Sequence, residues 1–80
     1  MNKIRAHISL DTQKKILDFI TQMNLEPDIY FIENESGTCR VDAHSMLGVI
    51  YASGDFVTEM YLVNETENGY FPFFINEYRV

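Results

Sequence analysis

The period of the apolar residues changes from two to about 3.6 between residues 4 and 23, and this change constrains the fold more than any other feature. Apolar side chains first alternate with polar ones, at Ile4, Ala6, Ile8 and Leu10. They then recur three or four residues apart, at Ile16, Phe19, Ile20 and Met23. Alternation is typical of a strand with one solvated face, and the second spacing is typical of an amphipathic helix. The sequence therefore predicts a strand over residues 3–10 and a helix that ends near Asn24, because Pro27 follows.

Shorter segments predict three further strands. These strands cover residues 29–32, 38–42 and 56–63. Asn34 and Gly37 tolerate the positive φ that a tight turn needs, so the first two of these strands are predicted to form a hairpin. Cys39 alternates with Val41 and is predicted to be a small buried hydrophobic side chain. Acidic residues such as Glu33 are predicted to solvate the surface.

A second helix is predicted within residues 45–52. Its apolar residues have the spacing of one helix face, at Met46, Leu47 and Ile50. Gly48 lowers the helix propensity of this segment. Residues 53–55, Ser-Gly-Asp, are predicted to turn the chain toward the last strand.

Residues 70–78 hold five aromatic side chains in nine positions, which is more than one helix face can bury. Phe71, Phe74 and Tyr78 have helical spacing, and Pro72 is tolerated in a first helical turn. A short C-terminal helix and an irregular aromatic segment both remain open. Aromatic side chains left exposed there predict a homodimer through this segment.

The predicted order of elements is β-α-β-β-α-β, followed by the aromatic tail. This order predicts an α+β fold with a four-stranded, mainly antiparallel sheet in split βαβ order and two to three helices on one face. Eighty residues, of which 46% are hydrophobic, suffice for a single domain over residues 1–80.

Charge and cysteine content exclude several classes of protein. The net charge is −6, from 6 Lys and Arg against 12 Asp and Glu, so no nucleic-acid partner is expected. Cys39 is the only cysteine and there are two histidines, so no disulfide, metal or cofactor is expected. No apolar run approaches the ~20 residues of a membrane span, and the alternation near residue 4 is unlike a signal peptide. A cytoplasmic protein that does not bind membranes is expected.

Residues 41–49 carry the most specific motif, Val-Asp-Ala-His-Ser-Met-Leu-Gly-Val, and residues 25–29 read Leu-Glu-Pro-Asp-Ile. With the order of elements, these segments resemble the family of the phosphocarrier protein HPr of the bacterial sugar phosphotransferase system. The resemblance covers about half of the chain well and the whole chain in the order of its elements. It implies an HPr-like open-faced β-sandwich with four strands and three helices.

The phosphocarrier motif of that family is absent from this sequence. In the family, a histidine flanked by Gly, Arg and Pro opens the first helix and carries the phosphoryl group. Residues 9–15 read Ser-Leu-Asp-Thr-Gln-Lys-Lys, and the alignment places Asp11 or Thr12 where the histidine would be. Asp11 or Thr12 can cap the helix that follows, and Asp11 is predicted to be a plain N-cap and not a phosphoryl acceptor. The resemblance therefore implies a divergent, non-catalytic regulatory or adaptor protein that has lost phosphocarrier activity.

Ser45 matches the serine that HPr kinase phosphorylates in some members of the family, which then act as corepressors. The N-terminus of a helix suits a phosphate group, and Ser45 is in any case predicted to be an N-cap. His44 is a candidate to pair with that phosphate. The matching apolar positions dock partner proteins in the family, so the candidates for partner binding are His44, Met46, Leu47 and Ile50. The implied partners are proteins of the phosphotransferase system or a transcriptional repressor.

Two other functions stay open. An active phosphocarrier would use a replacement group near Asp11, since carboxylates form acyl phosphates. A small ligand-binding module of ferredoxin-like topology would need dimerisation and a glycine-rich loop after the first strand, and residues 10–13 contain no glycine. No P-loop, dinucleotide fingerprint or Ser-His-Asp arrangement is present, so an enzyme is not expected.

Overall fold

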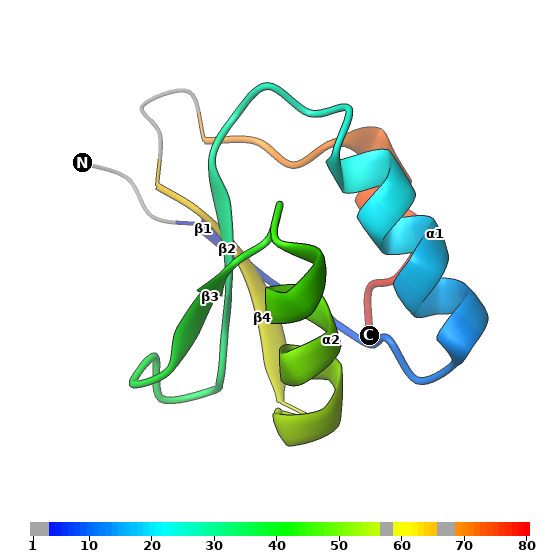
Figure 1. The fold of residues 1–80 in the computed structure, drawn as a ribbon. Helices are drawn as coiled ribbons and strands as arrows, with labels where there is room; N and C mark the ends of the chain where they lie inside the picture. The colour runs from blue at the N-terminus through cyan, green and yellow to red at the C-terminus, as the bar shows by residue number, and fades with distance from the viewer. Residues whose placement is uncertain (1–3, 57–58, 66–68) are drawn as a thin grey trace.

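The computed structural model describes residues 4–56, 59–65 and 69–80 and contains the strands and helices in the predicted order (Figure 1). Its strands are β1 (Ile4–Ile8), β2 (Tyr30–Glu33), β3 (Arg40–Asp42) and β4 (Met60–Asn64). Its helices are α1 (Gln13–Met23), α2 (Met46–Asp55) and the short 3-10 helix η1 (Phe73–Glu77). The predicted α+β class is confirmed.

The four strands form one antiparallel sheet in the order β1-β4-β2-β3. The last strand of the chain, β4, lies between β1 and β2, so that Leu62 pairs with Ala6 on one side and with Ile32 on the other. The connection from β1 to β2 and the connection from β3 to β4 therefore each step over one strand, which is the split βαβ arrangement.

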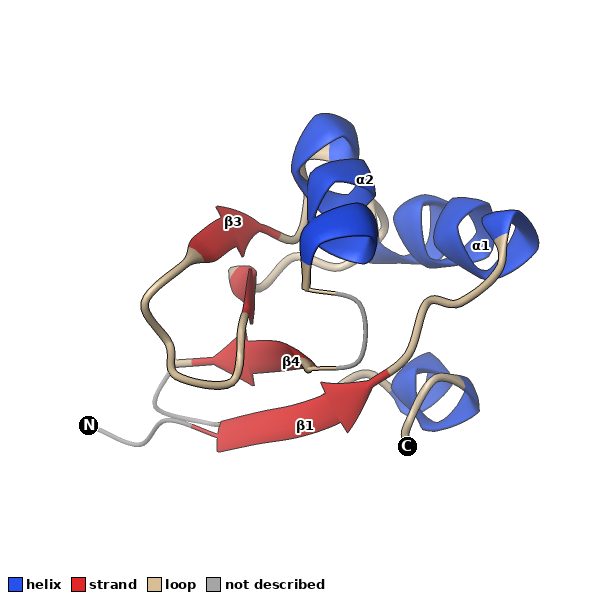
Figure 2. Cartoon of the chain, turned by 90° about the horizontal axis from the view of Figure 1, so that it is seen from below, coloured by secondary structure: helices blue, strands red, loops and turns tan. Residues whose placement is uncertain are grey.

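One face of the sheet carries the core. Its buried side chains are Ala6, Ile8, Tyr30, Ile32, Met60 and Leu62. The helices contribute Phe19, Ile20, Met23, Val49, Ala52 and Phe56. Figure 2 shows α1 and α2 on the same side of the sheet. The predicted alternation of the first strand and the apolar stripe of α1 are thus confirmed by burial.

The boundary between α2 and β4 differs from the prediction. The helix runs through Asp55, so the predicted turn at residues 53–55 is wrong; Ser53 Oγ donates to the carbonyl oxygen of Ile50 at 2.8 Å within the helix. Phe56 ends α2 and is buried in the core, so it does not begin the last strand. β4 begins at Met60, and residues 57 and 58 of the predicted strand lie outside the described part of the chain.

The hairpin turn between β2 and β3 forms as predicted, with Gly37 at φ 76°. The Asn34 side chain accepts from the N–H of Cys39 at 3.2 Å and donates to Thr38 at 3.1 Å. These bonds make residues up to Cys39 part of the loop, so β3 begins only at Arg40. The prediction that Cys39 is buried is wrong, because its side chain belongs to this exposed loop and not to a strand.

The aromatic tail forms a short helix, η1, which packs on α1. The rings of Phe74 and Tyr78 meet the ring of Phe19 edge to face, at 6.3 and 5.7 Å. The chain then pairs with β1, where the N–H of Ser9 donates to the Tyr78 carbonyl oxygen at 2.8 Å. Tyr70 and Phe73 remain 51% and 88% exposed. The predicted homodimer through this segment stays a prediction.

Candidate functional site

Ser45 begins α2 as its N-cap. Its backbone is extended, with φ −87° and ψ 118°, and its Oγ accepts from the N–H of Gly48 at 3.1 Å. Asp42 fixes the same turn, because its Oδ1 accepts from the N–H of His44 at 2.8 Å. The predicted N-cap is confirmed, and the hydroxyl of Ser45 lies at the positive end of the helix dipole.

Gly48 has a packing role that propensity alone does not reveal. A Cβ atom at this position would lie 3.2 Å from the carbonyl oxygen of Asp42 and 3.2 Å from the Cβ atoms of Ser45 and Val41. The first turn of α2 therefore lies directly against the end of β3. A glycine at this place allows the close approach that holds Ser45 in position.

His44 joins the start of α2 to the loop between α1 and β2. Its Nε2 lies 2.9 Å from the carbonyl oxygen of Glu26, and since a carbonyl only accepts, Nε2 carries a proton. Its Nδ1 lies 3.7 Å from Asp42 Oδ1, and its ring stacks on Tyr30 with the centroids 6.4 Å apart. These contacts hold two loops together. The pairing of His44 with a phosphate stays a prediction.

The apolar residues predicted to bind partners lie together on the exposed side of α2. We call the following four residues the α2 patch: Met46, Leu47, Ile50 and Tyr51. Their exposed fractions are 55%, 77%, 47% and 54%, whereas Val49 and Ala52 of the same helix are fully buried. Tyr51 was missed in the sequence, although it lies four residues after Leu47 and thus on the same face. Its hydroxyl donates to Asp55 at 3.2 Å, and this bond raises the pKa of Tyr51.

Thr12, and not Asp11, is the N-cap of α1. The Thr12 Oγ1 accepts from the N–H of Lys15 at 3.1 Å, with the Thr12 backbone extended at φ −130° and ψ 156°. The carboxylate of Asp11 instead pairs with Lys15 Nζ at 3.1 Å and is mostly exposed. Of the two residues predicted as possible caps, Thr12 is therefore confirmed, and the prediction that Asp11 is a plain N-cap is wrong. Thr12 takes this role because it directly precedes the first helical residue, Gln13.

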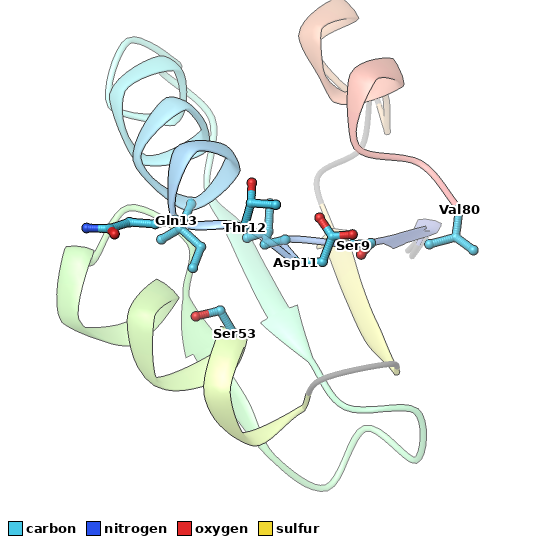
Figure 3. Close-up of a pocket in the computed structure, with 8 residues that line it drawn as sticks. Ser9, Asp11, Thr12, Gln13, Ser53 and Val80 are labelled. Atoms are coloured by element: carbon cyan, nitrogen blue, oxygen red, sulfur yellow. The ribbon is translucent and has the colours of Figure 1, made fainter.

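A cavity of about 580 Å³ lies at the start of α1 (Figure 3). Its lining residues are Ser9, Leu10, Asp11, Thr12, Gln13, Ile16, Ser53 and Val80. Figure 3 shows Asp11, Thr12 and Gln13 where β1 leads into α1, with Ser53 contributed by α2. Among the described residues that line this cavity there is no Lys, Arg or His. The place where the resemblance puts the family's histidine thus has a carboxylate and hydroxyl groups.

A network of charges on the other face of the sheet was not predicted from the sequence. Glu33 is only 1% exposed, which contradicts the prediction that it solvates the surface. Its carboxylate accepts from the Nε of Arg40 at 3.0 Å and also from the Nη2 of Arg40. Arg40 also donates to Glu65 at 3.0 Å, and the hydrogen bonds to Glu65 and Glu33 raise the pKa of this guanidinium. Glu33 is buried because Arg40 of the adjacent strand β3 and Arg5 of β1, on the far side of β4, cover it.

The aromatic rings of this outer face are covered by guanidinium groups. Arg5 lies 4.1 Å from the centroid of the Tyr61 ring, and Arg40 lies 4.3 Å from that of Phe31. The ring of His7 stacks on Tyr61 at 4.8 Å. Cation–π contacts of this kind contribute about 0.5–1 kcal/mol each at exposed sites. The outer face is therefore closed by its own side chains, unlike the α2 patch.

Comparison with protein-family models, with curated proteins and with solved structures gave no match. The HPr resemblance therefore depends on the motif at residues 41–49 and on the order of the elements. No helix in residues 4–56, 59–65 and 69–80 has the length and apolar character needed to cross a membrane. The same residues contain no cluster of three or more His, Cys, Asp or Glu side chains suited to a metal ion.

Proposed function

We propose that this chain is an HPr-like, non-catalytic regulatory or adaptor protein related to the phosphotransferase sugar uptake system. The observation that carries this proposal is the position of Ser45, which caps α2 directly beside the exposed α2 patch. We propose with this function that the α+β fold is an HPr-like open-faced β-sandwich. One sheet with both long helices on the same face supports that assignment.

The composition of the cavity at the start of α1 supports the loss of phosphocarrier activity. A phosphoryl group on a side chain is stabilised by a neighbouring cation, most effectively by an arginine. Of the two lysines that follow Asp11 in the first turns of α1, Lys14 is paired with Asp18 and Lys15 is paired with the Asp11 carboxylate itself. The first turn of α1 has backbone N–H groups that can donate hydrogen bonds to a phosphoryl group. Without a neighbouring cation, these groups stabilise a transferable phosphoryl group much less well.

Phosphorylation of Ser45 is the proposed regulatory step. The Ser45 hydroxyl is half-buried and already accepts from a backbone N–H of α2. A phosphate on this oxygen can accept from the N–H groups of the first turn and is favoured by the helix dipole. It would place about two negative charges at one end of the α2 patch, where a docked partner would meet them.

Measurement of the intact mass after two phosphorylation reactions tests the proposal. One reaction contains HPr kinase with ATP, and the other contains enzyme I with phosphoenolpyruvate. We expect one acid-stable phosphate from the kinase reaction and none from enzyme I. Ser45→Ala should lose the phosphate, whereas Thr12→Ala, which removes the matching cap of α1, should keep it.

Two results would contradict the proposal. An acid-labile phosphate from enzyme I would show an active phosphocarrier, and its loss in Asp11→Asn would place the acceptor at that carboxylate. The absence of phosphate from both reactions would remove the regulatory step and the link to the phosphotransferase system.

A further inference from the structure

The α2 patch is an apolar surface with acidic residues at both ends. Asp42 precedes α2 with its side chain 58% exposed, and Asp55 is the exposed last residue of the helix. The helix contains no lysine or arginine. Its ten residues rise about 1.5 Å each, so the two carboxylates are separated by roughly 15 Å or somewhat more along the helix.

The basic residues elsewhere do not offset this charge. Among the described residues, four Lys and Arg side chains lie within 4 Å of a carboxylate: Arg5, Lys14, Lys15 and Arg40. Arg79 stacks over Phe71 at 5.6 Å and donates to Asn76. The chain as a whole carries a net charge of −6. A molecule that approaches the α2 patch therefore meets a negative potential.

These charges make a second copy of the chain an unfavourable occupant, because two α2 patches in contact would bring acidic ends together. We infer that the α2 patch binds the apolar face of an amphipathic helix of another protein, with Lys or Arg at both ends of that face. This inference rests on the proposed adaptor function and specifies the chemistry of the partner.

The shape of the patch favours a helix as the partner. Its residues are four positions apart in two pairs, Met46 with Ile50 and Leu47 with Tyr51, and form a ridge along α2. Ridges of this kind pack into the grooves of a second helix. A partner strand would instead need the hydrogen-bonding edge of a sheet, and the α2 patch offers side chains alone.

Two synthetic peptides can test both the apolar contact and the charge. Both form amphipathic helices with the same leucine face, and one carries Lys where the other carries Glu. Fluorescence anisotropy of the labelled peptides gives the Kd for the full chain at low and high salt. The variants are Leu47→Ser in the patch, Asp55→Asn at its end, and Leu25→Ser as a control, since Leu25 is also 80% exposed but lies in the loop after α1.

We expect the Lys peptide to bind and the Glu peptide to bind at least about tenfold more weakly. Leu47→Ser should weaken binding of the Lys peptide by about tenfold or more, and Leu25→Ser should leave it unchanged. Asp55→Asn should reduce the salt dependence of the Kd. Far-UV circular dichroism of each variant checks that α2 is still formed.

Three results would overturn the inference. If the Glu peptide binds equally well and Leu47→Ser abolishes its binding, the docking surface stands and the cationic partner is wrong. If Leu47→Ser changes the binding of neither peptide, or if neither peptide binds, the α2 patch does not dock an amphipathic helix, whereas the mass measurement on Ser45 tests the regulatory proposal independently. If sedimentation equilibrium shows a dimer that Leu47→Ser dissociates, a second copy occupies the patch.

Discussion

The guanidinium of Arg5 and the carboxylate of Glu33 lie 3.6 Å apart, although strand β4 separates the strands that carry them. Arg5 reaches across Tyr61 and also donates to the backbone carbonyl oxygens of Asn34 and Glu35 at 2.8 and 3.0 Å. Arg40 meets the same carboxylate from the other side, from β3. Glu33 therefore links the two edge strands of the sheet, and Arg5 also fixes the hairpin loop beside it.

Replacement of Glu33 by glutamine should destabilise the protein. The variant leaves two guanidinium groups beside a buried neutral amide, and because both arginines are about one-third exposed we expect a loss of about 2 kcal/mol rather than the larger cost of a fully buried pair. Urea unfolding measures the free energy. Glu35→Gln, on the exposed turn, should change it by less than about 0.5 kcal/mol. Equal effects of the two variants would show that the network does not stabilise the fold.

The cap of α1 can be identified by a pair of substitutions. Thr12→Ala should reduce the free energy of unfolding by about 1 kcal/mol, because it removes the acceptor for the N–H of Lys15. Asp11→Ala removes only an exposed ion pair and should cost less than about 0.5 kcal/mol. Thermal unfolding of both variants gives the comparison. A larger cost for Asp11→Ala would place the cap on that residue.

The two glycines of α2 should respond to alanine in opposite ways. At Gly54 an added Cβ atom meets nothing within 4 Å, so Gly54→Ala should stabilise the helix by up to about 1 kcal/mol. At Gly48 the same atom would lie 3.2 Å from a backbone oxygen, so Gly48→Ala should destabilise the protein. Urea midpoints measure both effects. Stabilisation by both substitutions would mean that α2 does not approach β3 as closely as described.

Tyr30 should make stability depend on pH in the alkaline range. Burial raises the pKa of the Tyr30 hydroxyl far above its ordinary value, and Asp28 and Glu26 raise it further. Because the folded-state pKa is higher than the unfolded value of about 10, this stability is fully present below pH 10 and is lost as the pH rises through the folded value. The difference in unfolding free energy between wild type and Tyr30→Phe should therefore shift in favour of the variant between about pH 10 and 12. A difference that stays constant over this range would contradict the expectation.

Local patterns predicted the elements whose side chains repeat regularly. The alternation from Ile4 to Ile8, the apolar stripe of α1 and the cap at Ser45 all depend on residues a few positions apart. The end of α2 was predicted less well, because Phe56 joins the core only through packing with distant elements. The burial of Glu33 was missed for a similar reason. Its contact with Arg5 requires the strand order β1-β4-β2, which no periodicity of the sequence encodes.

The central place of β4 also determines when this chain can fold. Asn64 of β4 lies opposite Ile4 of β1 on one side and opposite Tyr30 of β2 on the other. β1 is therefore joined to the rest of the described sheet only through β4. Before residues 60–64 leave the ribosome, the β2–β3 hairpin can form with α2 packed against it, but β1 has no strand to pair with. Pairing between residues so far apart in the chain slows folding compared with helical proteins of the same size. The sheet therefore closes as a late event that depends on almost the entire chain.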